Sequence, residues 1–341
     1  MNKFRIIQVT GNPIEGSCRH RLTDIKRKRK LKMHDDQIYK GYYMITARCN
    51  LSCSYCILEN APHQLKQELS LLQKMELISH LYHNLKFRSL TISGGEALII
   101  GKSVPSDFLQ LLKFLKQFKS DDTQKNLQIK LYTNGIYVSE IVAFAMQGII
   151  DEVSINIDSS NDETLLLIGR NKNKKDKYFL KVVEVIKVLS SQGIKVKLHT
   201  VVSTLNYQNI ALEVRAIYET VKNANPMFKQ WKFYQYMSYD DIVVDEKHQI
   251  DIEIFESVQK EIEENLSGLD VDIHFKSNQE MNQSLFNILA TGIAQYRLPE
   301  NTWTTTPRTE NLLSYKSMEQ LIERNKIDVD LFNAYHSYSP I

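Results

Sequence analysis

The sequence has few cysteines and no long apolar run. No stretch reaches the roughly 18 consecutive apolar residues of a membrane-spanning helix, and the N-terminus lacks the apolar core of a secretory signal. Four cysteines in 341 residues are too few for a disulfide framework, and three of them fall within eight residues. We therefore expect a cytoplasmic protein in which the clustered cysteines hold a metal site and Cys18 is an ordinary thiol.

The basic run of residues 26–32 lacks both acidic and aromatic residues. It carries six positive charges, so the rest of the chain is net negative although the whole chain has a net charge of +3. Such a run attracts phosphates or nucleic acid. It has no interleaved aromatic side chains on which bases stack, which favours a solvated surface segment.

The clustered cysteines lack a fourth partner. Cys49, Cys53 and Cys56 stand in the stretch ARCNLSCSYCIL, residues 47–58, and no cysteine follows Cys56. Structural zinc sites and plain electron-transfer clusters use four protein ligands. The spacing by itself leaves open a zinc site completed by a distant histidine, for instance His63, and a plain cluster-binding module.

Short apolar runs alternate with amphipathic stretches from about residue 40 onward. The predicted strands are residues 42–46, 89–93, 128–133, 152–157, 195–202, 231–236 and 271–275. The predicted helices are residues 69–84, 106–119, 176–192, 210–223 and 252–266. Strand and helix repeat about six times, which requires parallel strands joined by crossover helices. We therefore predict an α/β fold, an open or partial (β/α)6 TIM-like barrel.

Short polar motifs fall at the ends of several predicted strands. The cysteines follow the first strand, SGGE (residues 93–96) the second, TNG (133–135) the third, and SINID (154–158) is the fourth. The carboxyl ends of parallel barrel strands meet at one mouth, where such folds carry their chemistry. Alone, a glycine pair is more often a turn and TNG a helix start.

Taken together, these motifs resemble those of the radical S-adenosylmethionine (SAM) enzymes. The resemblance implies a partial barrel of the radical SAM type, with the three thiolates on three irons of a 4Fe-4S cluster. The fourth iron is then open to the amino and carboxylate groups of S-adenosyl-L-methionine. An electron from an external donor such as flavodoxin or ferredoxin cleaves this cofactor, and the resulting 5'-deoxyadenosyl radical abstracts a hydrogen atom from the substrate, while the protein binds, orients and excludes water.

The resemblance also implies which residues contact S-adenosyl-L-methionine. Gly94 and Gly95 have no side chains and let the backbone approach the methionyl group. Glu96 is suited to accept from the ammonium, and the ring of Tyr55 matches the aromatic position beside the adenine. Further contacts are expected from Thr133, Asn134, Ser154, Asn156 and Asp158, of which the last three alternate on one strand and face the barrel interior near the ribose. Asn156 as a satisfied core amide is the alternative.

The second half resembles viperin and its prokaryotic counterparts over about residues 40–290. The matching stretches are LLIGR (166–170) with NKNKK after it, VKLHTVVSTLN (196–206), QWKFYQ (230–235) and KSNQEM (276–281). That family dehydrates nucleoside triphosphates to 3'-deoxy-3',4'-didehydro forms in antiviral defence. The absence of cysteine after Cys56 argues against the peptide-maturing and molybdopterin-precursor branches, which carry auxiliary clusters.

The same resemblance points to a set of substrate contacts. Arg170, Lys197 and Lys232 match the family's phosphate-binding residues, and cations that converge on one place suit a triphosphate. Ser93 and His199 are further candidates on neighbouring strand ends. Where the family has other residues, this chain has Ser89, Gln230, Tyr42 and Phe286. These departures keep open a radical SAM enzyme acting on a peptide or a nucleic-acid base, and a non-catalytic cluster or zinc protein that binds nucleic acid.

Each basic candidate also has a structural alternative. Lys197 in an apolar strand needs an anionic partner, which is either a ligand or an acidic neighbour such as Glu96 or Asp158. Arg170 is otherwise a surface loop residue, Lys232 a rim residue, and His199 a core histidine.

We divide the chain into a basic extension (1–39), a barrel core (40–240) and a C-terminal extension (241–341) that covers the barrel mouth. Within the last part, residues 304–308 are expected to form a lid over the mouth or a surface loop.

Overall fold

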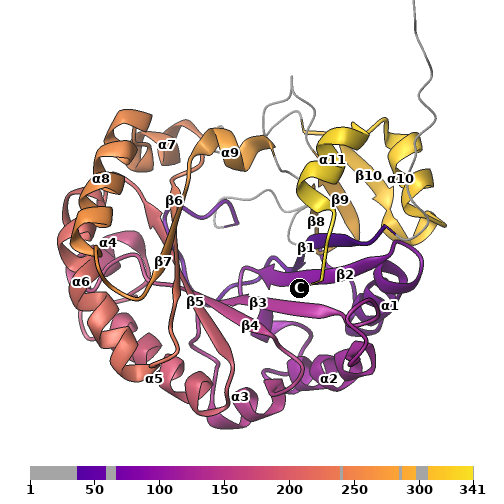
Figure 1. Ribbon diagram of the computed structural model, residues 1–341, viewed down its shortest axis with the longest axis horizontal. Helices are drawn as coiled ribbons and strands as arrows, with labels where there is room; N and C mark the ends of the chain where they lie inside the picture. The colour runs from indigo at the N-terminus through magenta and orange to yellow at the C-terminus, as the bar shows by residue number, and fades with distance from the viewer. Residues whose placement is uncertain (1–36, 59–66, 239–240, 284–285, 297–305, 341) are drawn as a thin grey trace, which may run out of the picture. The chain divides into compact units, whose positions relative to one another are not determined.

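The computed structural model describes residues 37–58, 67–238, 241–283, 286–296 and 306–340 (Figure 1). Cys18, the basic run, His63 and the start of the expected lid lie outside these residues. Within them, a single sheet contains the strands β1 (Tyr39–Thr46), β2 (Phe87–Gly94), β3 (Gln128–Thr133), β4 (Glu152–Asn156), β5 (Lys195–Val202), β6 (Gln230–Gln235), β7 (Asp272–Lys276), β8 (Phe286–Ile288), β9 (Ile293–Tyr296) and β10 (Arg308–Asn311). Their order across the sheet is β10-β9-β8-β1-β2-β3-β4-β5-β6-β7.

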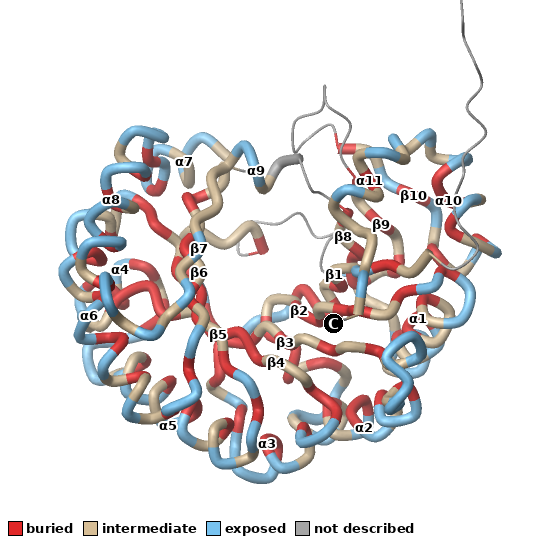
Figure 2. The backbone as a smooth tube through the Cα atoms, in the orientation of Figure 1, coloured by how far each residue is buried: buried red, intermediate tan, exposed pale blue. Residues whose placement is uncertain are grey.

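The strands β1 to β7 are all parallel to their neighbours, and helices pack on their outer face (Figure 1). Six longer or crossover helices are α1 (Leu71–His83), α2 (Ser106–Leu115), α3 (Glu140–Met146), α5 (Tyr178–Ser191), α6 (Tyr207–Ala224) and α8 (Ile252–Asn265). Figure 2 shows buried residues along the strands and exposed residues on the outer sides of these helices. The predicted α/β fold and partial TIM-like barrel are therefore confirmed.

Alternation along each strand separates the core from the barrel interior. On β6, Trp231 and Phe233 are fully buried, and their rings stack with centroids 4.9 Å apart. Lys232 and Tyr234 fall on the opposite side of this strand, where they line an internal cavity. Because successive side chains of a strand point to opposite faces, the apolar packing of one face fixes which polar residues enter the barrel.

The C-terminal region joins the same sheet. β8 pairs in parallel with β1, and β9 and β10 continue it in antiparallel fashion. The helix α11 (Val329–His336) packs here, with the ring of Phe332 5.7 Å from Tyr39 and 5.2 Å from Phe286. The domain boundaries at residues 39 and 240 stay predictions, while the described sheet continues across the second of them.

The short elements were not predicted from the sequence. Besides α3 and β8 to β10, these are α4 (Asp162–Ile168), α7 (Ile242–His248), α9 (Asn278–Gln283), α10 (Met318–Asn325) and α11. Elements of three to eight residues are too short to show a clear hydrophobic period. None of the helices in the described part of the chain has the length and apolarity that crossing a bilayer requires.

Candidate active site

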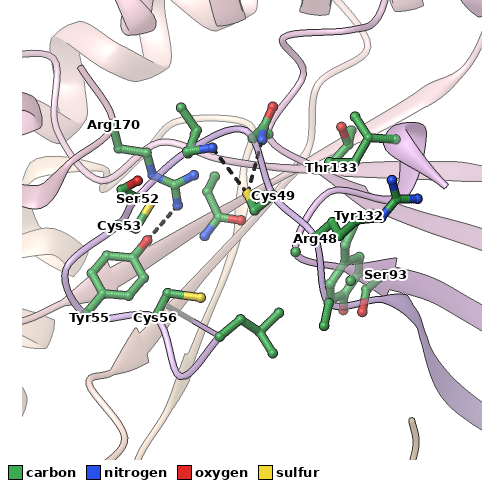
Figure 3. A pocket seen from close by; sticks show the side chains of 18 of the residues that line it. Arg48, Cys49, Ser52, Cys53, Tyr55, Cys56, Ser93, Tyr132, Thr133 and Arg170 are labelled. Carbon is green, nitrogen blue, oxygen red and sulfur yellow. Dashed lines mark hydrogen bonds between the residues drawn. The ribbon is translucent and has the colours of Figure 1, made fainter. Parts of the chain in front are cut away.

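The cysteine loop follows β1 and forms one wall of a cavity of about 590 Å³. Cys49 is exposed, Cys53 buried and Cys56 half-buried, and all three line this cavity. Figure 3 shows them on one loop, with Arg170 and Tyr55 beside them and Ser93 and Tyr132 across the cavity. Burial raises the pKa of the Cys53 thiol to about 12, so the thiolate needs a bound positive centre to persist at neutral pH.

The glycine pair at the end of β2, Gly94 and Gly95, is required by the cysteine loop itself. The N–H of Gly95 donates to the carbonyl of Thr46 at 2.9 Å, and the N–H of Glu96 donates to that of Arg48 at 2.8 Å. A Cβ on Gly95 would lie 2.4 Å from the Arg48 carbonyl oxygen and 2.9 Å from Cys49 Cβ. Only glycine allows the two backbones to approach this closely. The predicted approach of this backbone to a methionyl group stays a prediction.

A third glycine holds the loop from the other side. Gly169 ends α4 with a φ of +90°, and a Cβ there would lie 2.2 Å from the carbonyl oxygen of Ser52. Beside it, the N–H of Ser54 donates to the carbonyl of Ile168 at 2.8 Å. The cysteine loop is thus held between two backbone segments that tolerate no side chain.

Glu96 is fully buried behind the cavity wall. Its Oε1 accepts hydrogen bonds from the N–H of Leu98 and the hydroxyl of Thr133, at 3.1 and 2.8 Å, and its Oε2 accepts from the N–H of Asn134 at 2.8 Å. These bonds occupy three of the carboxylate's roughly four acceptor positions. Glu96 therefore fixes the ends of β2 and β3, and its role toward an ammonium group stays a prediction.

Tyr55, Asp158 and Arg170 form one buried network. The Tyr55 hydroxyl donates to Asp158 Oδ2 at 2.8 Å, and Arg170 Nε donates to the same oxygen at 2.9 Å. Arg170 Nη2 also donates to the Tyr55 hydroxyl at 2.5 Å. Arg170 is 7% exposed, so the alternative of a surface loop residue is wrong. It lines the cysteine cavity, and its predicted contact with phosphate stays a prediction.

A second cavity of about 550 Å³ adjoins the first and lies inside the barrel. Both cavities share a wall made of Tyr42, Tyr55, Cys56, Leu58, Gly94, Tyr132 and Asn156. Of the predicted substrate residues, His199 and Lys232 line the second cavity, while Ser93 and Arg170 line the first. A molecule in the second cavity therefore lies next to the cysteine loop.

The second cavity carries an excess of positive charge. Lys232 and Lys276 line it, and burial together with Lys276, Lys197 and Lys130 lowers the pKa of Lys232 to about 8. Lys197 lines neither cavity; burial lowers its pKa, and its acidic neighbour is Glu152, not the predicted Glu96 or Asp158. Lys276 was not among the residues predicted from the sequence, although it begins the stretch KSNQEM.

His199 sits between two tyrosines in this cavity. Its ring centroid lies 4.7 Å from that of Tyr132 and 5.2 Å from that of Tyr234. Burial and the neighbouring Lys197 and Lys232 hold the pKa of His199 well below its usual range, so the ring is neutral. Its Nε2 has no hydrogen-bond partner among the described residues, as is also true of the Ser154 hydroxyl. Buried polar atoms without partners are costly. A ligand in the second cavity, which His199 lines, would satisfy its Nε2.

The donor set fits a cluster better than a single ion. In the described segments, no three His, Cys, Asp or Glu side chains come close enough together to hold one metal ion. A cubane cluster places its irons at separate corners, so its thiolate ligands surround a volume and do not converge on one point. Cys49, Cys53 and Cys56 around one cavity satisfy that requirement.

Relatives identified by sequence act on nucleotides. An S-adenosylmethionine-dependent nucleotide dehydratase of Fibrobacter sp. (strain UWH6) is 24% identical over 206 residues, 58% of this chain and 55% of that protein. A GTP 3',8-cyclase of Chlorobaculum tepidum is 27% identical over 156 residues, 46% of this chain and 42% of that protein. The chain thus matches about half the length of these curated relatives.

Solved structures share the fold at low identity. Streptococcus suis SuiB bound to S-adenosylmethionine superposes with a TM-score of 0.61 at 10% identity, over 88% of this chain and 68% of that one. The structure of anSMEcpe with bound S-adenosylmethionine and a peptide superposes with a TM-score of 0.59 at 16% identity, over 86% of this chain and 83% of that one.

The family model of the Radical SAM superfamily matches residues 43–215, which include the second half of β1, the strands β2 to β5 and the cysteine loop. Members of this superfamily are enzymes that bind a 4Fe-4S cluster and cleave S-adenosylmethionine, and the three cavity cysteines are suited to hold that cluster. This chain belongs to the radical SAM superfamily.

Proposed function

We propose that this enzyme removes water from a nucleoside triphosphate and forms a 3'-deoxy-3',4'-didehydro nucleotide. The observation that carries the proposal is the pair Lys232 and Lys276 in the cavity beside the cysteine loop. Two ammonium groups in a partly buried site, with Lys197, Lys130 and the carboxylate of Glu152 close behind, leave an excess of positive charge that is costly without a further anion. A triphosphate is an anion of suitable charge for such a site.

The comparisons support a nucleotide substrate. The relatives with the names quoted above, a nucleotide dehydratase and a GTP cyclase, both act on nucleotides. The resemblance to the viperin-like enzymes adds the dehydration and a role in antiviral defence. The electron comes from an external donor such as flavodoxin or ferredoxin.

In this proposal the residues of the chain bind, orient and exclude water. When bound, the cluster and S-adenosylmethionine supply hydrogen-atom abstraction at a carbon of the substrate. Lys232 and Lys276 hold the phosphates at the β6–β7 side, and the shared wall with Tyr42 and Tyr132 places the sugar next to the cysteine loop. The neutral His199 adds no further positive charge beside these lysines.

Cyclisation of a nucleotide is the second candidate, because several relatives are GTP 3',8-cyclases. The two reactions differ in their products, since dehydration releases one water and ring closure within the same molecule need not. The absence of cysteine after Cys56 leaves the chain without thiolates for a second cluster, which favours dehydration.

An anaerobic assay with reconstituted enzyme, dithionite, S-adenosylmethionine and each of the four ribonucleoside triphosphates tests the proposal. Mass spectrometry should show 5'-deoxyadenosine stimulated by one triphosphate, together with a product that lacks one water. A product of unchanged mass supports cyclisation. Cleavage that no nucleotide stimulates would point to a different substrate class.

A further inference from the structure

Two amide side chains face the second cavity from strands that lie beyond β1. Asn287 on β8 and Gln295 on β9 are register partners in an antiparallel pair, and Asn287 is also the partner of Tyr42 on β1. All three residues line the cavity. Directly opposed residues of an antiparallel pair have Cβ atoms about 4.5–5.5 Å apart on the same face. Tyr42, Asn287 and Gln295 therefore form one row across three adjacent strands.

No residue in the described ranges engages either amide side chain. In the portion of the chain that the structure describes, the side chains of Asn287 and Gln295 make no hydrogen bond to another residue. Gln235, another amide of the same cavity, behaves differently: it donates from Nε2 to the carbonyl of Ile250 at 3.0 Å and accepts from the N–H of Asn278 at 3.0 Å. Gln235 is thus used by the fold, whereas no described residue occupies the donors and acceptors of Asn287 and Gln295, which can therefore serve a ligand.

The free amides and the lysines come from different ends of the sheet. Lys232 and Lys276 belong to β6 and β7, at one end of the strand order, and the amides belong to β8 and β9, near its other end. Figure 1 shows β6 and β7 on one side of the barrel interior and β8 and β9 on the other. A ligand that fills the cavity therefore meets positive charge at one end and uncharged donors and acceptors at the other.

We infer that Asn287 and Gln295 recognise the edge of the nucleobase. This inference rests on the proposed nucleotide substrate. A carboxamide presents one donor and one acceptor side by side, which matches the adjacent donor and acceptor atoms on the edge of a base. Two such groups in a row select a base by its hydrogen-bonding pattern, while the lysines hold the phosphates of any nucleotide. The amides are in this way the specificity-determining residues of the site.

Binding measurements on the reconstituted enzyme test this assignment. Dissociation constants for the four ribonucleoside triphosphates and for inorganic tripolyphosphate are measured by calorimetry without reductant, so that no turnover is needed. Asn287→Leu and Gln295→Leu should each lower the affinity for the preferred triphosphate by about 5- to 150-fold and leave the affinity for tripolyphosphate unchanged. Lys276→Ala should lower the affinity for both ligands. Gln147 is an exposed residue outside the cavity, so Gln147→Leu should change neither affinity.

The conservative substitution Asn287→Asp separates recognition from folding. It keeps the size of the side chain but replaces the two donors of the amide with an acceptor, so the base preference should move toward bases with an exocyclic amino group. The inference is overturned if the leucine variants bind the triphosphates as the wild type does. It is also overturned if they lose affinity for triphosphate and tripolyphosphate to the same extent. If the wild-type enzyme binds no nucleotide, the proposed function itself fails, which is a separate result.

Discussion

Arg170 and Asp158 form a buried ion pair directly behind the cysteine loop, with Arg170 Nε 2.9 Å from Asp158 Oδ2. Both side chains are almost inaccessible to solvent, with exposures of 7% and 0%. The carboxylate also accepts from the backbone of β5, through the N–H of Val201 at 2.9 Å. The pair therefore connects the loop after α4, the cysteine loop and the barrel wall.

Removal of one partner of this pair should destabilise the protein strongly. Asp158→Ala leaves the Arg170 guanidinium buried without its partner, which we expect to lower the free energy of unfolding by about 3–5 kcal/mol. Urea unfolding of the cluster-free chain measures the change. The exposed pair of Arg215 and Glu219 offers the control, since Glu219→Ala should cost no more than about 1 kcal/mol. Equal effects of the two substitutions would contradict the role assigned to burial.

The contact at Gly169 should control cluster content. In Gly169→Ala the new Cβ would meet the Ser52 carbonyl, so the cysteine loop must move, and we expect less iron and sulfide per chain after reconstitution. Gly193 has a similar positive φ of +69°, but a Cβ added there would meet nothing within 4 Å. Gly193→Ala should therefore cost only about 1–2 kcal/mol of backbone strain and retain the full cluster. Similar iron contents in the two variants would contradict the idea that the close contact between Gly169 and Ser52 holds the cysteine loop in place.

Substitution of any of the three cavity cysteines should abolish the cluster, whereas substitution of Cys18 should not. Cys49→Ala, Cys53→Ala and Cys56→Ala should each lose the cluster, because each removes one of the three thiolates that the superfamily uses. Cys18→Ser should keep it, as expected of an ordinary thiol. Iron analysis and the response of the reduced cluster's paramagnetic resonance spectrum to S-adenosylmethionine provide the readout. Loss of the cluster in Cys18→Ser would require a different ligand set.

Nucleotide affinity should fall as the pH rises through about 8. The pKa of Lys232 is lowered to about 8, so this residue is charged below that pH and neutral above it, and an anionic ligand favours the charged form. Between pH 7 and 9 the phosphates themselves no longer titrate, because their last pKa lies near about 6. The dissociation constant should therefore increase over this interval. In Lys232→Arg, which stays charged, it should remain flat, and a flat profile in the wild type would show that Lys232 does not contact the anion.

The long elements of the barrel and its cysteine loop could be predicted from the sequence, because their periods and motifs are local. All seven predicted strands are found as β1 to β7, with boundaries within three residues of the prediction. β8 and β9 have only three and four residues, and the place of β8 beside β1 depends on pairing across more than 240 residues of chain. A local pattern contains no information about such pairing.

The same limit applies to the second cavity. Lys197 and Lys232 were found through a family resemblance. Only the structure shows that Lys232 lines the second cavity, whereas Lys197, the register partner of Ser154, lines neither cavity. Asn287 and Gln295 gave no signal in the sequence, since isolated amides are ordinary surface residues. Their significance comes from the side of β8 and β9 on which they fall, which tertiary packing decides.

The attachment of β8 to the barrel is narrow. Two register pairs join β8 to β1, whereas seven join β1 to β2. Segments held by few backbone hydrogen bonds open locally at a smaller free-energy cost than the centre of a sheet. We therefore expect a bulky molecule to enter and leave the barrel through the wall that carries Asn287. The backbone amides of β8 should then exchange with deuterium faster than those of β5.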